Sequence, residues 1–196
     1  MSFDLIRDQI RSSVTVKLAI LEDADRLAFI GRLAHQCVDA LRKCCKVIVV
    51  GNGGSFADAQ HLSAEFVSHF MYDCAPLASV ALGTNSSAMS AIGNSYGYEQ
   101  FFSREFAVIT KVDDVFIPLS TSGSSPNVLA VVKTARELGI TTVGLKGETR
   151  GQMKYLCDCT CVPSRETARI QEFHILDGYI LCGLMEERCF PKNKPQ

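Results

Sequence analysis

Hydroxyl side chains are concentrated just before Pro126. Residues 120–125 read Ser-Thr-Ser-Gly-Ser-Ser and follow a short apolar run. Proline suits the first position of a helix, because a backbone N–H is not needed there. The free N–H groups of a helix N-terminus, with five hydroxyl groups beside them, make a phosphate site that needs little net charge. A serine-rich linker is the other interpretation, but a buried strand before the run and a helix after it disfavour a linker.

A second turn rich in small residues follows the apolar residues 47–50. Residues 51–55 read Gly-Asn-Gly-Gly-Ser. Three glycines allow the backbone to turn tightly and to approach a ligand closely. Ser55 and Asp58 have the spacing of a capping box, so we expect Ser55 to cap the helix that follows. Taken alone, the motif supports an ordinary glycine-rich turn as well as it supports a binding site.

Two side chains with proton or metal chemistry follow this turn. His61 and Glu65 are four residues apart on the expected helix, so they project from the same face. This spacing serves either a pair of metal ligands or a base with an orienting partner. Without the motif around it, Glu65 would be interpreted as a solvated helix residue.

The elements that position these residues are short strands alternating with helices. The runs are apolar on both faces, which is typical of a parallel sheet buried between two helix layers. We therefore expect a flavodoxin-like, doubly wound α/β fold with five parallel strands and ligands bound at the carboxyl ends of the strands. Pro118 is expected at the end of the third strand, where a missing N–H does least harm. The expected strands are Val47–Val50, Ala78–Leu82, Val115–Ile117, Thr141–Leu145 and Cys159–Val162.

Two amphipathic helices precede this core. Ile6, Ile10, Val14 and Leu18 recur every four residues, and a second run of the same kind continues to Leu41. The periodicity leaves open whether the first helix packs on its own core or on another subunit. We expect one domain over residues 1–196, with a helical oligomerisation segment at about 1–45 and an α/β core at about 46–190.

Composition excludes several classes of partner. Lysine and arginine number 20 against 21 acidic residues, so there is no basic field to hold nucleic acid or a membrane surface. No stretch approaches the length of a membrane span, and the N-terminus mixes acids and bases. The nine cysteines are odd in number and scattered, which favours reduced thiols. A cytoplasmic protein with a small ligand is expected.

Four motifs in the same order resemble the phosphoheptose isomerases, a branch of the sugar-isomerase (SIS) domain family. The resemblance implies an SIS fold, no nucleotide cofactor and a homotetramer with its sites between subunits. It also implies conversion of sedoheptulose 7-phosphate to D-glycero-D-manno-heptose 7-phosphate through an enediol, the first step toward bacterial ADP- or GDP-heptose for lipopolysaccharide or capsule. The motifs are Gly51–Ser55 with Ala57–His61, Ser86–Asn94, Ser120–Val128 and Thr167–His174.

The resemblance also implies roles for individual residues. Glu65 would be the base that carries the proton, with His61 beside it. In some members of the family zinc sits at the site, and the matching positions are His61, Glu65 and Gln171. The residues implied in substrate binding are Asn52, Gly53, Ser55, Asn85, Ser120, Thr121, Ser122, Ser125 and Gln171.

Four positions depart from the family pattern near the expected site. The family's second site histidine is Tyr179 here, its arginine is His69, and two of its aspartates are Asn85 and Ser95. A phenol is a weaker acid than an imidazolium, but it still donates a hydrogen bond or shuttles a proton, so we expect Tyr179 to act in place of the histidine. The alternative is a non-catalytic SIS protein that binds a sugar phosphate as a sensor or scaffold. Retention of His61 and Glu65 favours the enzyme.

Overall fold

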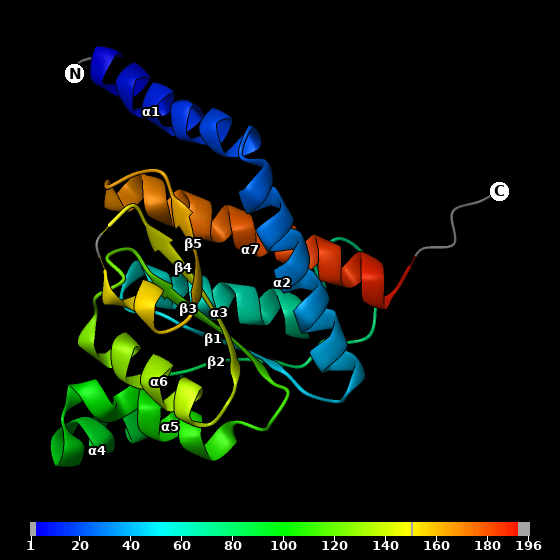
Figure 1. Ribbon diagram of the computed structural model, residues 1–196, viewed down its shortest axis with the longest axis vertical. Helices are drawn as coiled ribbons and strands as arrows, with labels where there is room; N and C mark the ends of the chain where they lie inside the picture. Colours follow the sequence, from blue (N-terminus) through cyan, green and yellow to red (C-terminus); the bar gives the residue numbers. More distant parts are fainter. Residues whose placement is uncertain (1–2, 150, 192–196) are drawn as a thin grey trace.

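The computed structural model describes residues 3–149 and 151–191, which form seven α-helices, two short 3₁₀ helices and five strands (Figure 1). In chain order they are α1 Phe3–Leu21, α2 Ala24–Arg42, β1 Val47–Val50, α3 Gly54–Val67, β2 Ser79–Ala81, α4 Ser86–Tyr96, η1 Tyr98–Gln100, α5 Phe101–Ile109, β3 Val115–Ser120, α6 Pro126–Glu137, β4 Thr141–Gly147, η2 Gln152–Tyr155, β5 Asp158–Val162 and α7 Thr167–Cys189.

The five strands form one parallel sheet in the order β2-β1-β3-β4-β5. This is the flavodoxin-like order, so the predicted fold class is confirmed. Helices α2, α3 and α7 cover one face of the sheet, and α5 and α6 cover the other with α4 outside them (Figure 1). The order of the strands changes direction between β1 and β3, which places the loops after these two strands at the binding edge of the fold.

Alternate residues of the strands supply the two halves of the core. Val47 and Val49 of β1 face α2, α3 and α7, whereas Ile48 and Val50 face α5 and α6. All four residues of β1 are buried. The apolar character of both faces, from which the sheet was predicted, is thus a direct consequence of its two helix layers.

The prediction that Pro118 ends the third strand is wrong. Strand β3 continues to Ser120, and all six of its residues are buried at the centre of the sheet. Pro118 lies opposite Val50, the last residue of β1, so its missing N–H falls where that pairing ends. The pairing with β4 is interrupted at the same place, since its register includes Phe116 and Leu119 but neither residue between them.

One arginine ties α2 to the opposite end of the chain. The side chain of Arg26 is buried, and its guanidinium donates to Thr160 Oγ1 at 2.7 Å and to the Cys161 carbonyl at 2.6 Å. It also forms a buried ion pair with Asp177 of α7. These contacts join α2, β5 and α7 into one unit.

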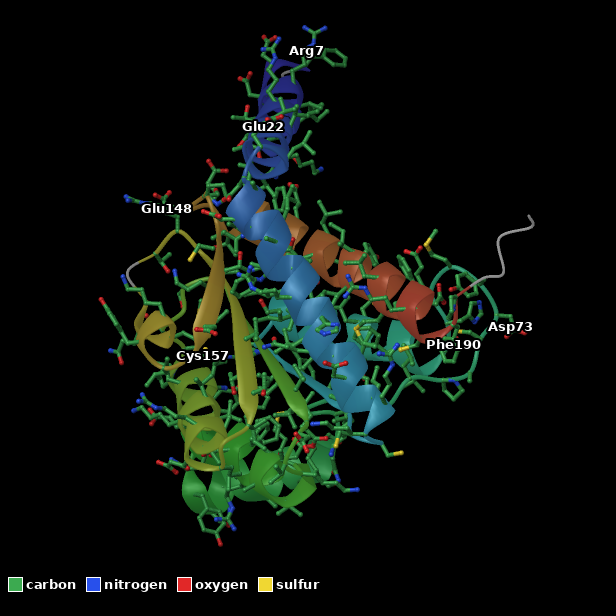
Figure 2. All side chains as sticks on the ribbon, turned by 45° about the vertical axis from the view of Figure 1, so that its right-hand side comes forward. Arg7, Glu22, Asp73, Glu148, Cys157 and Phe190 are labelled. Carbon is green, nitrogen blue, oxygen red and sulfur yellow. The ribbon has the colours of Figure 1, made fainter. Side chains whose placement is uncertain are left out.

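Helix α1 projects from the molecule and is attached along one side only. Ile20 packs with Ile170 and Phe173 of α7, and the Arg169 guanidinium donates to the Gln9 carbonyl at 2.7 Å. In Figure 2, Arg7 lies near the outer end of α1 and Glu22 at its base. Only Ser13 and Ile20 of α1 are buried. Ile6, Ile10 and Leu18, on the predicted apolar stripe, are 45, 59 and 57% exposed. Among the described residues, no helix is long and apolar enough to cross a membrane.

Candidate active site

The loops that follow β1 and β3 are joined by a pair of amide side chains. Asn52 Nδ2 donates to Asn127 Oδ1 at 2.7 Å, and Asn127 Nδ2 donates back to Asn52 Oδ1 at 2.9 Å. The hydroxyl of Tyr98 donates to the same Asn52 oxygen at 3.2 Å. Asn52 was predicted as a site residue, but Asn127 and Tyr98 were not. Asn127 is buried in the first turn of α6. Its position directly after the serine loop is the feature of the sequence that could have identified it as a site residue.

The glycine turn begins α3 two residues earlier than the sequence indicated. Gly53 is the N-cap, with φ at +56°, and no side chain caps the helix. The predicted capping box of Ser55 and Asp58 is therefore wrong, because Ser55 already lies inside the first turn and is buried. Burial raises the pKa of Asp58, although the nearby His61 acts in the opposite direction.

The serine loop lies at the N-terminus of α6, as predicted. Ser125 is the N-cap and Pro126 the first helical residue, and no side chain caps this helix end. Ser120 Oγ accepts from the Gly123 N–H at 3.1 Å, which folds the loop back on itself. The N–H groups of Ser122 and Ser125 donate no hydrogen bond within the described residues, so they are available to an anion.

The predicted catalytic residues meet between α3 and α7. His61 Nε2 lies 3.3 Å from Glu65 Oε1 and 3.1 Å from Tyr179 Oη. The ring of Tyr179 stacks on Phe70, with centroids 5.5 Å apart. One imidazole nitrogen therefore connects a carboxylate with a phenol, and the stacked Phe70 holds the phenol in place.

The two helices that carry these residues run in the same direction. Gly54 faces Gln171 near the start of both helices, and Leu62 faces Gly178 further along. A Cβ on Gly178 would lie 2.2 Å from a methyl group of Leu62, so glycine is needed there for the close approach. Because the helices keep this register, His61 of α3 comes opposite Tyr179 of α7.

Gln171 lies apart from this catalytic group. Its side-chain nitrogen would be 2.0 Å from a Cβ on Gly54, so it packs against the glycine turn. Tyr179 is eight residues further along α7, which is about 12 Å along the helix axis. The structure thus brings together His61 and Glu65 of the predicted zinc ligands but places Gln171 beside the glycine turn. Within the described part of the chain, no cluster of three or more His, Cys, Asp or Glu side chains could hold a metal ion.

Known proteins share both the sequence and this architecture. The SIS domain model matches residues 13–147. The chain is 47% identical to a phosphoheptose isomerase of Aneurinibacillus thermoaerophilus, covering 97% of this chain and 96% of the relative. The chain belongs to the phosphoheptose isomerase branch of the SIS family. It is also 45% identical to a phosphoheptose isomerase of Burkholderia pseudomallei (strain 1710b) over 96% of each chain.

Solved structures of the family have the same fold. A phosphoheptose isomerase from Francisella tularensis superposes with a TM-score of 0.90 at 31% identity, covering 95% of this chain and 99% of the other. One from Neisseria gonorrhoeae gives 0.87 at 33% identity, covering 94 and 98%. The predicted family is confirmed over nearly the whole length.

Of the remaining departures from the family pattern, His69 follows the end of α3, whereas Asn85 and Ser95 lie at α4, on the other face of the sheet from α3 and α7 (Figure 1). Asn85 caps α4, and its side-chain oxygen accepts from the Ala88 N–H at 3.0 Å. His69 is exposed and, with Glu65, lines a cavity of about 10 Å³. Ser95 is exposed near the end of α4. Of the four departures, Tyr179 contacts a predicted catalytic side chain directly, through the hydrogen bond with His61.

Proposed function

We propose that this chain isomerises D-sedoheptulose 7-phosphate to D-glycero-D-manno-heptose 7-phosphate through an enediol, the first step of bacterial ADP- or GDP-heptose synthesis. Relatives named phosphoheptose isomerase match it over nearly their full length. The observation that carries the proposal is that His61 lies within 3.3 Å of Glu65 and 3.1 Å of Tyr179. This arrangement supports the proposal, because it brings a base and an acid group together at the residues that the family resemblance implies in catalysis.

In the proposed reaction Glu65 moves the proton. Its carboxylate takes a proton from C1 of the ketose and returns it to C2, while the proton on O1 passes to O2, so that the enediol becomes the aldose. His61 orients the Glu65 carboxylate, and the Tyr179 hydroxyl donates to the oxygen on which negative charge develops. The N–H groups and hydroxyls of the serine loop hold the phosphate, while Asn52 and Gln171 face the sugar from the glycine turn.

A binding protein without catalysis is the second candidate. It was favoured by the four departures, of which Tyr179 is the one in contact with the catalytic group. That contact supplies a proton donor where the family has histidine, so the departure no longer argues against catalysis. The full-length relationship to isomerases also favours the enzyme.

We also propose a homotetramer in the cytoplasm, with a sugar phosphate as its small-molecule ligand. The exposed stripe of α1 supports self-association, because an amphipathic helix leaves an apolar face in water only at a cost of about 25 cal/mol per Å². The charge balance supports the absence of nucleic-acid and membrane partners.

Zinc binding is a separate proposal from the reaction. His61 and Glu65 offer one nitrogen and one carboxylate oxygen, which fill two of the four positions that zinc prefers. Gln171 of the same chain packs at Gly54, so these residues do not complete a three-ligand set within one chain, and the reaction above uses no metal. Elemental analysis of the purified protein and of His61→Ala tests it: zinc that is present and lost in the variant supports the proposal, and its absence from both excludes it.

The function is tested by NMR of the purified protein with sedoheptulose 7-phosphate in heavy water. We expect the aldose to form, with deuterium incorporated from solvent. Glu65→Gln, which keeps the shape of the side chain but removes its basicity, should abolish both signals. Exchange without product would leave Glu65 as a base lacking its acid partner. Binding of the sugar phosphate with neither signal would favour the non-catalytic protein.

A further inference from the structure

A lysine is buried at the binding edge of the sheet without an acidic partner. The side chain of Lys146, near the end of β4, is 1% exposed. Its ammonium donates to the carbonyls of Gly147 at 2.7 Å and Thr149 at 3.0 Å. Within the described residues it forms no ion pair with a carboxylate. Glu148, the nearest acid in sequence, is exposed at the outer surface (Figure 2).

Such a charge is costly unless something compensates it. Removing an ammonium from water costs several kcal/mol in practice, and two carbonyl dipoles offset only part of that cost. Buried charges in proteins are therefore usually paired with an opposite charge or with a ligand. The residues around Lys146 indicate whether its partner is an acidic side chain or a bound ligand.

The serine loop lies directly against this lysine. Ser120 of β3 pairs with Lys146 of β4 in the sheet register. A Cβ on Gly123 would lie 3.3 Å from the Lys146 Cδ, which places the lysine stem under the middle of the loop. Gly147 and Thr149, whose carbonyls accept from the ammonium, also bind the loop. Gly147 donates its N–H to the Thr121 carbonyl at 3.2 Å, and Thr149 Oγ1 donates to the Ser122 carbonyl at 2.6 Å.

We propose that Lys146 supplies the positive charge of the phosphate site, acting from beneath the serine loop on the bound dianion. The loop itself contains only neutral residues at positions 120–125, so its N–H groups and hydroxyls orient the phosphate without balancing its charge. A lysine serves well as a point charge for a phosphate. The bound phosphate in turn is the counter-charge that the buried ammonium lacks. The inference rests on the phosphate site of the proposed function, but it does not depend on isomerisation.

The test is calorimetric titration of the full chain with inorganic phosphate, which requires no catalysis. Lys146→Met removes the charge and keeps most of the apolar stem, whereas Lys146→Gln removes the charge and keeps a hydrogen-bond donor. Lys154→Met is the matched control, because it removes one charge from an exposed lysine in η2. We expect both Lys146 variants to weaken phosphate binding about tenfold, which is ~1.4 kcal/mol, and the control to bind like the wild type.

Other outcomes separate charge from structure. Wild-type affinity in Lys146→Gln with weak binding in Lys146→Met would show that the lysine only holds residues 147–149, and would overturn the proposal. Unchanged affinity in both variants, or no phosphate binding by the wild type, would overturn it as well. If Lys146→Met fails to fold in urea titrations, Lys146→Gln and the charge-retaining Lys146→Arg decide, with affinity expected only in the latter. Lysine-dependent phosphate binding without isomerase activity would leave this inference standing and reject the proposed reaction.

Discussion

At the scale of single residues, Tyr179 is the position on which the proposed chemistry depends most directly. Its hydroxyl contacts His61, while its ring stacks on Phe70. Tyr179→Phe removes the hydroxyl and keeps the stacking, so we expect kcat to fall about 100-fold, the usual size of a general-acid contribution, with little change in KM. Steady-state kinetics measure both constants. Tyr155→Phe, at an exposed tyrosine, serves as the control, and an undiminished kcat in Tyr179→Phe would remove Tyr179 from the mechanism.

His174 is a buried residue that makes the stability of the fold depend on pH. Burial, assisted by the charge of Arg26, lowers its pKa to about 4, and a contact with the Lys146 backbone opposes this only in part. Between about pH 6.5 and 4 the unfolded chain binds a proton at this position that the folded chain does not bind. The free energy of unfolding is therefore unaffected by His174 above pH 6.5. As the pH falls toward 4, protonation of His174 in the unfolded chain lowers this free energy by up to ~3 kcal/mol.

Urea unfolding at pH 7 and pH 4.5 checks this expectation. His174→Leu should reduce the loss of stability between the two pH values, because leucine takes up no proton in either state. His35→Leu replaces an exposed histidine and should leave the loss unchanged. Equal losses in the wild type and in His174→Leu would assign the acid sensitivity to other groups.

At the scale of elements, the buried ion pair of Arg26 and Asp177 holds α2 against α7. Arg26→Met keeps a long apolar side chain but leaves the Asp177 carboxylate buried without its cation. Removing one partner of such a pair costs about 3–5 kcal/mol, so the urea midpoint should fall markedly. Lys43→Ala, which breaks the exposed pair with Asp113, should leave the midpoint almost unchanged. Equal shifts in the two variants would contradict the structural role of the buried pair.

Most elements could be predicted from sequence because their signals are local. The four-residue apolar repeat indicated α1 and α2, and runs apolar on both faces indicated the buried strands. Pro118 was misjudged because its tolerance depends on β1 ending opposite it, which only the sheet register shows. Ser55 was misjudged as a cap because glycine at position 53 takes that place with a positive φ. The link from Tyr98 to Asn52 is tertiary and has no signature in the spacing of residues.

The catalytic group was predictable only in part for a related reason. His61 and Glu65 share a helix face, so their proximity follows from the helix period. The approach of Tyr179 depends instead on the parallel register of α3 and α7, which Gly178 sets by its contact with Leu62. That glycine lies inside a helix, where sequence alone suggests no special role for it.

At the scale of the whole molecule, α1 determines the expected assembly. Its apolar stripe is exposed in the single chain, while Ala19 lies on another exposed part of the same helix. Ile10→Asp introduces a charge into the stripe, so we expect the oligomer to dissociate to smaller species in sedimentation velocity. Ala19→Asp adds the same charge away from the stripe and should sediment like the wild type. An unchanged sedimentation coefficient for Ile10→Asp would exclude the stripe as the subunit contact.

The contacts of Arg26 also bear on how the chain is made. Its partner Asp177 lies 151 residues later in the sequence. At ribosomal rates of about 5–20 residues per second, Arg26 emerges roughly 8 to 30 s before that carboxylate does. During this interval α2 has neither α7 nor β5 to cover it, and its apolar face is open to chaperones and to other nascent chains. The contacts that join α2 to β5 and α7 therefore form only after α7 has been synthesised, and a chain stalled before α7 would lack them.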